Sequence, residues 1–208
     1  MLKSGKNGTR SMPERARLFD VASEHGGYFT SGEAKASSFS RALLSHHVKS
    51  GRFVRVKRGL YRFREYPGSP REHVLAAWLA VGKDTAVISH ESALDILGLS
   101  DVVPDAVHLT VPRSRRSQRL LPGVKMHTIW RLLPREDLVL RDGMVITSAA
   151  RSIVDAARAG AAPDQIEKAV IQAMERGLVT AGHLGKLAKE RGKRVAALIA
   201  SALEKAVR

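Results

Sequence analysis

The residue types that most often perform chemistry are present, but their spacing does not form a recognisable active site. Eight histidines occur along the chain, and none has a partner at the HExxH spacing that binds zinc from one face of a helix. His46 and His47 are adjacent, so a helix directs their rings to different sides. We therefore expect no metal site and no other cofactor.

A short run, Ser89-His90-Glu91, places a hydroxyl, an imidazole and a carboxylate side by side. A catalytic triad needs these groups to converge from separate places, and the GxSxG turn of hydrolases is absent. A serine helix cap with an acidic residue in the first turn explains the run more simply. Gly82-Lys83-Asp84 lacks the flanking residues of a phosphate-binding loop. These patterns predict a protein that is not an enzyme.

Positive charge is the dominant feature of the composition. The 208 residues hold 35 Lys and Arg against 20 Asp and Glu, a formal net charge of +15, which favours a polyanionic partner. Residues 1–70 hold 14 basic and 5 acidic side chains, and residues 71–208 hold 21 and 15. The chain has no cysteine, so disulfides and thiolate metal sites are excluded.

The basic residues are densest in the segment Ser50–Phe63, SGRFVRVKRGLYRF, where Arg52, Arg55, Lys57, Arg58 and Arg62 alternate with apolar side chains. Two β-prone runs, 52–56 and 60–63, are separated by Lys-Arg-Gly, which predicts a tight hairpin. Such charges can simply protect a strand edge from pairing with other chains. They can also clamp phosphates, as the wing of a DNA-binding domain does.

The elements around this hairpin favour the second interpretation. A basic arm is expected over the first dozen residues, then a helix from Pro13 to residue 25, a short helix around Glu33 that Thr30 or Ser31 caps, and a helix over 39–50. Three helices followed by a two-stranded ribbon is the order of a winged helix-turn-helix. The segment EYPGSPR, residues 65–71, is the expected linker.

Beyond the linker the pattern becomes mixed. Helices are expected over 71–82, 89–99 and 148–160, with strands at 85–88, 106–112, 123–130 and 144–147, and three more helices follow from Pro163. The sequence therefore predicts an α+β protein with a winged helix-turn-helix domain, residues 1–66, and a mixed α/β domain with a helical C-terminus, residues 71–208.

The third helix is the expected DNA-reading element. If the core-facing residues are Phe39, Leu44, His47 and Val48, the opposite side of the helix presents short hydroxyls and an arginine to a groove. Arg41 can there reach a guanine edge or a phosphate. The hairpin supplies the phosphate clamp. The predicted DNA-binding residues are Ser40, Arg41, Ser45, His46, Lys49, Arg55, Lys57 and Arg58.

The run Gly26–Phe63 resembles the N-terminal winged-helix domain of AbiEi-family antitoxins, with a basic strand, an Arg-Gly pair and a Tyr-Arg strand. AVISHESALDILGL, AVHLTVPRSRR and MVITSAARSIVDAA are similar to the second domain of that family. The resemblance implies a bacterial antitoxin that represses its own operon at inverted repeats and counteracts a nucleotidyltransferase-like toxin. Carried onto this sequence, it implies DNA contacts from Ser40, Arg41, Ser45, Lys49, Lys57 and Arg58.

Two alternatives use the same charge: an RNA- or tRNA-binding accessory protein, and a stand-alone transcriptional regulator. Readers of single-stranded RNA stack bases on exposed aromatic rings, and only 5% of this chain is aromatic, so duplex DNA is the favoured partner.

A basic loop in the second domain contains Arg113, Arg115, Arg116 and Arg119. It is either a solvated loop or a contact for a partner or a phosphate.

The sequence contains no apolar run of membrane-spanning length, and no apolar core follows the basic start. We expect a cytoplasmic protein with no membrane partner.

Overall fold

The computed structural model describes residues 15–118 and 121–206. The chain divides into two compact units, Met1–Glu72 and His73–Arg208, called here the N-terminal unit and the C-terminal unit. The α+β class predicted from the sequence is confirmed. The basic arm and the helix start expected at Pro13 lie outside the described residues.

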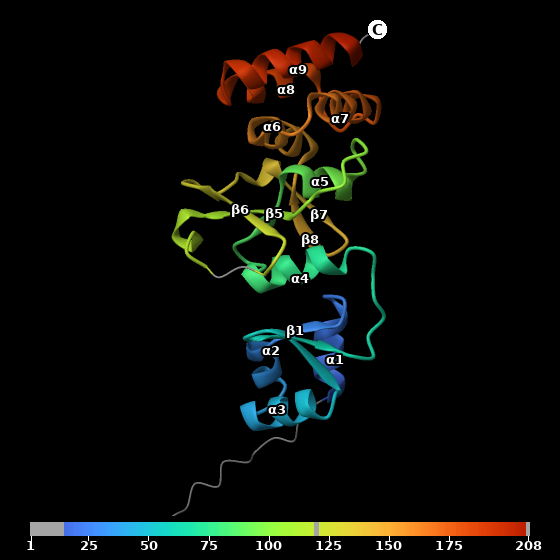
Figure 1. Cartoon of the computed structure of the whole chain (residues 1–208), viewed down its shortest axis with the longest axis vertical. Helices are drawn as coiled ribbons and strands as arrows, with labels where there is room; N and C mark the ends of the chain where they lie inside the picture. The colour runs from blue at the N-terminus through green and yellow to red at the C-terminus, as the bar shows by residue number, and fades with distance from the viewer. Residues whose placement is uncertain (1–14, 119–120, 207–208) are drawn as a thin grey trace, which may run out of the picture. The chain divides into compact units, whose positions relative to one another are not determined.

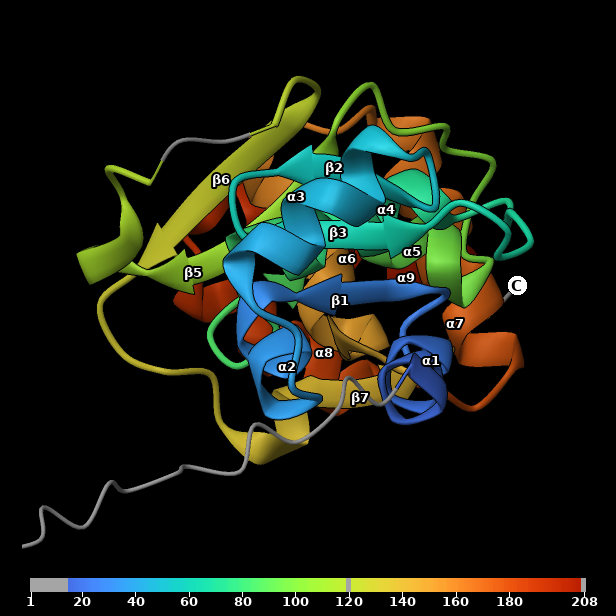
Figure 2. The same ribbon diagram turned by 90° about the horizontal axis from the view of Figure 1, so that it is seen from below.

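The N-terminal unit is a winged helix-turn-helix. Its three helices follow the predicted order, and three antiparallel strands form a sheet in the order β1-β3-β2, with β3 in the middle (Figure 2). The sequence predicted only the two strands of the hairpin. The additional strand is β1, three residues long, which pairs with β3 from Tyr28↔Arg62 to Thr30↔Leu60. The elements are α1 (Arg15–Ser23), β1 (Tyr28–Thr30), α2 (Ser31–Ala36), α3 (Arg41–Lys49), β2 (Phe53–Lys57) and β3 (Leu60–Phe63).

Side-chain caps fix where the two short helices begin. Thr30 accepts a hydrogen bond from the Glu33 backbone, and the Glu33 carboxylate accepts one from the Thr30 backbone, which forms a capping box at α2. Ser40 caps α3 by accepting from the Leu43 N–H at 3.2 Å. The helices pack on the sheet through a core of apolar side chains: Leu18, Ala22, Phe29, Ala34, Phe39, Leu44, Phe53 and Phe63.

The turn between α1 and β1 depends on Gly27. Its φ is +84°, in the left-handed region that residues with a Cβ avoid. A Cβ placed on Gly27 would lie 2.4 Å from both Cβ and Cγ of Tyr66. Tyr66 in turn packs against Phe19 and donates its hydroxyl proton to the Ser23 carbonyl at 3.2 Å. The glycine therefore lets the chain after β3 close over the end of α1.

The C-terminal unit is built on a mixed five-stranded sheet in the order β6-β5-β4-β8-β7. Strands β4–β8 and β5–β6 pair in parallel, and β4–β5 and β7–β8 pair antiparallel. The four strands predicted from the sequence are present, whereas β7 was missed. The elements up to the last strand are α4 (Glu72–Val81), β4 (Val87–Ile88), α5 (His90–Leu97), β5 (Val107–Pro112), β6 (Val124–Ile129), β7 (Leu138–Arg141) and β8 (Met144–Thr147).

Helices cover both faces of this sheet. Helix α4 lies on one side, and α5, α6 and the C-terminal helices lie on the other (Figure 1). Every residue of β5 from Val107 to Val111 is buried, as expected for a strand covered on both faces. The last helices, all predicted from the sequence, are α6 (Ala149–Ala159), α7 (Pro163–Glu175), α8 (Ala181–Glu190) and α9 (Lys193–Ala206). Among the described helices, none has both the length and the apolar character that crossing a membrane requires.

Candidate nucleic-acid interface

Helix α3 presents its polar side to solvent. Leu44 is buried against the core, whereas Arg41, Ser45, His46 and Lys49 are exposed. The helix is short and begins directly at Arg41, so this arginine lies at its N-terminal end. In a winged helix-turn-helix, the N-terminal residues of the third helix are those that reach base edges.

Ser40 was predicted to contact DNA as part of the third helix. It lies one residue before α3, is exposed, and holds the helix start through the hydrogen bond from Leu43 described above. Its hydroxyl oxygen therefore has a structural task that the sequence prediction did not assign.

A hollow of about 580 Å³ lies between α3 and the hairpin. It brings together four of the predicted residues, Arg41 and Ser45 from the helix with Arg55 and Arg58 from the hairpin. His46, Lys49 and Lys57 do not line it. The sequence prediction missed other lining residues, among them Ser31, Gly59 and Tyr61. The pairing of the two hairpin strands could have indicated Tyr61, because it lies directly opposite Arg55, and side chains opposite one another lie on the same face of the sheet.

The hairpin tip differs slightly from the sequence expectation. Lys57 pairs with Leu60 at the end of β2, after a bulge between Arg55 and Lys57, so Arg58 and Gly59 alone form the turn. Gly59 has a φ of +86°, which suits a two-residue hairpin turn. Arg58 is exposed at the tip. Lys57 is half-buried, and this burial lowers the pKa of its ammonium group.

One of the five basic residues of the hairpin segment is held within the N-terminal unit. The Arg62 guanidinium lies against the Glu72 carboxylate and donates to the carbonyls of Tyr66 and Pro67 at 2.9 and 3.0 Å. Its side chain is largely buried. Arg62 therefore secures the segment after β3, and the exposed positive charge of the hairpin segment comes from Arg52, Arg55 and Arg58.

The basic loop of the C-terminal unit is partly described. Arg113, Arg115 and Arg116 are exposed in a short 3₁₀ turn after β5, and Arg119 lies outside the described residues. The Arg113 guanidinium lies 4.1 Å from the centre of the Trp130 ring, a cation–π contact at the surface.

The winged helix-turn-helix matches a known family. Residues 16–64, from α1 to just past β3, match the family model described as "Transcriptional regulator, AbiEi antitoxin". The match lies within the N-terminal unit and covers 49 of the 208 residues of the chain. The resemblance stated from the sequence for the winged helix-turn-helix is thereby confirmed, and the AbiEi family is one of antitoxins that regulate transcription. The segments of the second domain that resemble the family lie outside the match. No curated protein matches the sequence.

The fold also has a counterpart among solved structures. The Rv2827c protein from Mycobacterium tuberculosis is similar in structure, with a TM-score of 0.59 at 18% sequence identity. The likeness covers 92% of this chain and 76% of that chain. At this identity the comparison concerns the fold, and it extends well beyond the segment that the AbiEi family model matches.

Proposed function

We propose that this protein is an antitoxin that represses its own operon by binding duplex DNA at inverted repeats, and that it counteracts a nucleotidyltransferase-like toxin encoded beside it. The AbiEi match supports the general class. The observation that supports the DNA-binding role is the hollow in which Arg41 and Ser45 of α3 face Arg55 and Arg58 of the hairpin. In this proposal the protein acts in the cytoplasm by binding, with no catalytic step.

Each side of the hollow has its own task in the proposed complex. Helix α3 enters the major groove, where the small Ser45 side chain permits close approach and Arg41 reaches a guanine edge. Arg58 at the hairpin tip and Arg55 beside it neutralise phosphates on the flanking backbone. The exposed Lys49 and His46 extend the basic surface along the helix.

The aromatic side chains of the N-terminal unit favour duplex DNA over single-stranded RNA. Phe29 stacks on Tyr61, and Phe53 packs edge-on against Phe29 and Phe63. Phe19, the most exposed of the rings in the described residues of this unit, packs against Phe63 and Tyr66. Rings engaged in this way do not form the open stacking platform that unpaired bases require.

For the antitoxin role we propose a surface on the C-terminal unit. Arg113, Arg115 and Arg116 are exposed, and Arg113 lies over the ring of Trp130. Trp130 is 82% exposed and Leu132 is 77% exposed. Exposed tryptophan with arginine is the composition enriched at the centres of protein interfaces. We assign this surface to the toxin and the α3–hairpin face to DNA, so each unit carries one role.

The proposed operator binding is tested with the full chain and its own upstream DNA. Fluorescence anisotropy at fixed salt compares a labelled upstream duplex with a duplex of shuffled sequence and with a single-stranded RNA of the same length. We expect tight binding to the upstream duplex alone. The double variant Arg41→Ala/Arg58→Ala should abolish this preference, whereas the double variant Arg115→Ala/Arg141→Ala, with the same loss of charge, should retain it. Equal binding to all three nucleic acids would overturn the proposal of an autorepressor.

A further inference from the structure

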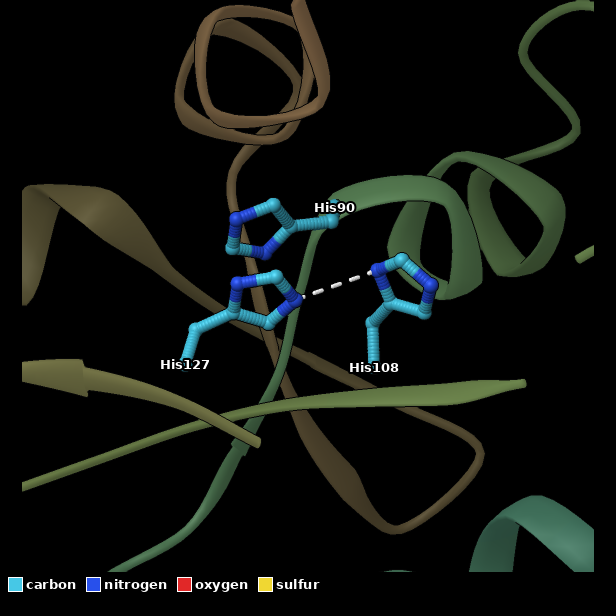
Figure 3. Close-up of side chains that lie close together, drawn as sticks. All are labelled: His90, His108 and His127. Atoms are coloured by element: carbon cyan, nitrogen blue, oxygen red, sulfur yellow. Dashed lines mark hydrogen bonds between the residues drawn. The ribbon is translucent and has the colours of Figure 1, made fainter. Parts of the chain in front are cut away.

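Three histidines that are far apart in the sequence meet inside the C-terminal unit (Figure 3). His90 is the first residue of α5, His108 lies in β5 and His127 lies in β6. One ring nitrogen from each lies within 4.8 Å of the other two. The rings of His90 and His127 are stacked, with their centres 3.5 Å apart, and His127 Nε2 lies 3.2 Å from His108 Nδ1.

The strand register explains why the side chains converge. In the parallel pair β5–β6, His108 lies opposite Lys125 and Thr110 lies opposite His127, so both histidines point to the same face of the sheet. Helix α5 starts directly after β4, the other neighbour of β5, and covers this face. The spacing of histidines along the sequence does not group His90, His108 and His127, because each comes from a different helix or strand.

His90 holds an unfavourable backbone conformation that places its ring in the cluster. Its φ is +55°, in the left-handed region that a residue with a Cβ seldom adopts. The preceding serine was expected to cap α5, but the Ser89 side chain makes no hydrogen bond to the helix backbone. Instead Ser89 Oγ lies 2.8 Å from His90 Nδ1 and accepts a hydrogen bond from Thr110 at 2.8 Å. The hydroxyl orients the imidazole rather than the helix.

His108 has an unpaired nitrogen on its other side. Its side chain is 1% exposed, and Nε2 has no hydrogen-bond partner. The carboxylates of Glu91 and Asp105 lie 3.6 and 3.8 Å from it. Histidine metal ligands typically bind through one nitrogen and direct the other N–H to a carboxylate. A metal on Nδ1 fixes the proton on Nε2 and directs it toward these two acids.

We propose that His90, His108 and His127 bind one divalent transition-metal ion, with zinc as the preferred metal. Three imidazole ligands, with no thiolate or carboxylate ligand beside them, suit zinc and the neighbouring transition metals rather than magnesium or calcium. Two nitrogens bound to one tetrahedral zinc lie about 3.3 Å apart, and His108 Nδ1 and His127 Nε2, which share a hydrogen bond, are 3.2 Å apart. The rings of His90 and His127 lie in nearly parallel planes, so one of them turns to direct both nitrogen lone pairs to the same ion. Glu91 and Asp105 lie on the far side of the His108 ring, near its Nε2.

The site is accessible from one side. His90 and His127 line a hollow of about 430 Å³ together with Thr110, Thr128 and Arg158. This hollow gives a metal ion a route to the imidazoles and leaves room for a fourth ligand, such as water. The bound ion links α5, β5 and β6, so it stabilises the C-terminal unit independently of DNA binding.

The test uses the full chain, stripped with a chelator and dialysed. Zinc binding is measured by competition with a chromophoric chelator, and cobalt(II) is added separately to read the ligand field in the visible spectrum. We expect one zinc per chain, a tetrahedral cobalt spectrum and a higher melting temperature with zinc. His127→Gln should weaken zinc binding at least about a hundredfold, as expected for loss of a ligand, and Glu91→Gln about tenfold to a hundredfold, as for outer-shell partners.

The control is His183→Gln, which removes an exposed histidine of the same unit at the start of α8. It should bind one zinc with unchanged affinity. If His90→Gln does not fold because of its backbone conformation, His127→Gln at its less buried position still decides the question. Zinc binding that is equally tight in His127→Gln, or a cobalt spectrum that does not change on adding protein, would overturn the proposal and indicate surface binding only.

Discussion

The Arg62 guanidinium forms an ion pair with the Glu72 carboxylate, with Nε and Oε1 3.1 Å apart, at the end of the N-terminal unit. Tyr28 donates its hydroxyl proton to the same carboxylate at 3.0 Å, and burial together with this carboxylate raises the tyrosine pKa. A residue of β1, one of β3 and one at the start of α4 therefore share one polar cluster. Arg62 thus belongs to the structure of the unit, although it lies in its most basic segment.

Arg62→Met should lower the stability of the N-terminal unit rather than its DNA affinity. Loss of the ion pair and of the hydrogen bonds to the carbonyls of Phe63, Tyr66 and Pro67 should cost about 1–3 kcal/mol, since Glu72 is left without its cation. Urea unfolding followed by far-UV circular dichroism measures this cost. The matched change Arg58→Met, at an exposed position, should cost less than about 0.5 kcal/mol. The reverse ranking would show that Arg62 has no structural role.

Arg41 and Arg58 should show different defects in DNA binding. Arg41→Ala should lose about 1–3 kcal/mol of discrimination between operator and shuffled DNA, because a base-edge contact is lost. Arg58→Ala should weaken binding to both DNAs alike and reduce the salt slope by about 1, because one phosphate contact is lost. Anisotropy titrations at several salt concentrations measure both quantities. Equal losses on the two DNAs for Arg41→Ala would assign Arg41 to the backbone.

Gly27 provides a test of the turn that closes the N-terminal unit. Gly27→Ala should destabilise this unit by about 2–4 kcal/mol, because the alanine must hold a positive φ and also displace Tyr66. Gly51 is the matched control, with a φ of +75° and no atom closer than 3.8 Å to an added Cβ, so Gly51→Ala should cost only about 1–2 kcal/mol. The difference in unfolding free energy between the two variants measures the cost of the clash with Tyr66, apart from the cost of the positive φ.

The aromatic residues allow the two units to be followed separately in this experiment. Both tryptophans, Trp78 and Trp130, lie in the C-terminal unit, and all three tyrosines lie in the N-terminal unit. Tryptophan fluorescence should therefore report an unchanged unfolding transition in Gly27→Ala. Circular dichroism should show an additional transition at lower urea. A shift in the tryptophan transition would contradict the assignment of the effect to the N-terminal unit.

The sequence predicted the helices and the hairpin because their signals are local. Apolar spacing, the caps at Thr30 and Ser40 and the Arg58-Gly59 turn all lie within a few residues of the elements they define. Strand β1 was missed because three residues carry too little pattern. Strand β7 was missed despite a usable signal: Asp142 and Gly143, with φ of +49° and +74°, form the Asp-Gly turn that joins it to β8.

The candidate sites divide in the same way. Arg41, Ser45, Arg55 and Arg58 could be predicted because one short segment of sequence holds them all. His90, His108 and His127 could not be grouped, because only the pairing of β5 with β6 and the start of α5 bring them together. Sequence spacing reveals metal ligands that lie on one helix or strand. Ligands that come from several elements can be grouped only once the pairing of the strands and the packing of the helices are known.

The histidine cluster should make the metal-free protein sensitive to mild acid. Burial, followed by the neighbouring imidazoles, lowers the pKa of His90 to about 2 and of His127 to about 4, and burial also lowers that of His108. Lys125 and Arg151 act in the same direction on His90, whereas Glu91 and Asp105 oppose it at His108. The unfolded chain therefore binds more protons than the folded one below the ordinary histidine pKa of about 6.5.

The three neutral histidines therefore contribute fully to the stability of the folded state above pH 6.5. This contribution is lost as the pH falls toward 4. With chelator present, we expect the unfolding free energy of the C-terminal unit to fall by about 2–4 kcal/mol between pH 7 and pH 5. Urea unfolding followed by tryptophan fluorescence measures it. His127→Gln should show a smaller fall, and His183→Gln the same fall as the parent. An identical fall in His127→Gln would assign the acid sensitivity to groups outside the cluster.

The division of roles between the units can be tested in cells. The variant Arg41→Ala/Lys57→Ala/Arg58→Ala should lose operator binding yet still protect cells from the toxin that we propose to be its partner, because the proposed toxin surface lies on the C-terminal unit around Trp130. The toxin is expressed from an unrelated inducible promoter, so repression of the native operon cannot account for rescue.

The reciprocal variant Arg113→Ala/Trp130→Ala should keep operator binding and lose protection, since exposed tryptophan and arginine side chains carry much of the energy of protein interfaces. Circular dichroism confirms that both variants are folded. Loss of protection in the first variant with retention in the second would place the antitoxin activity on the DNA-binding unit instead.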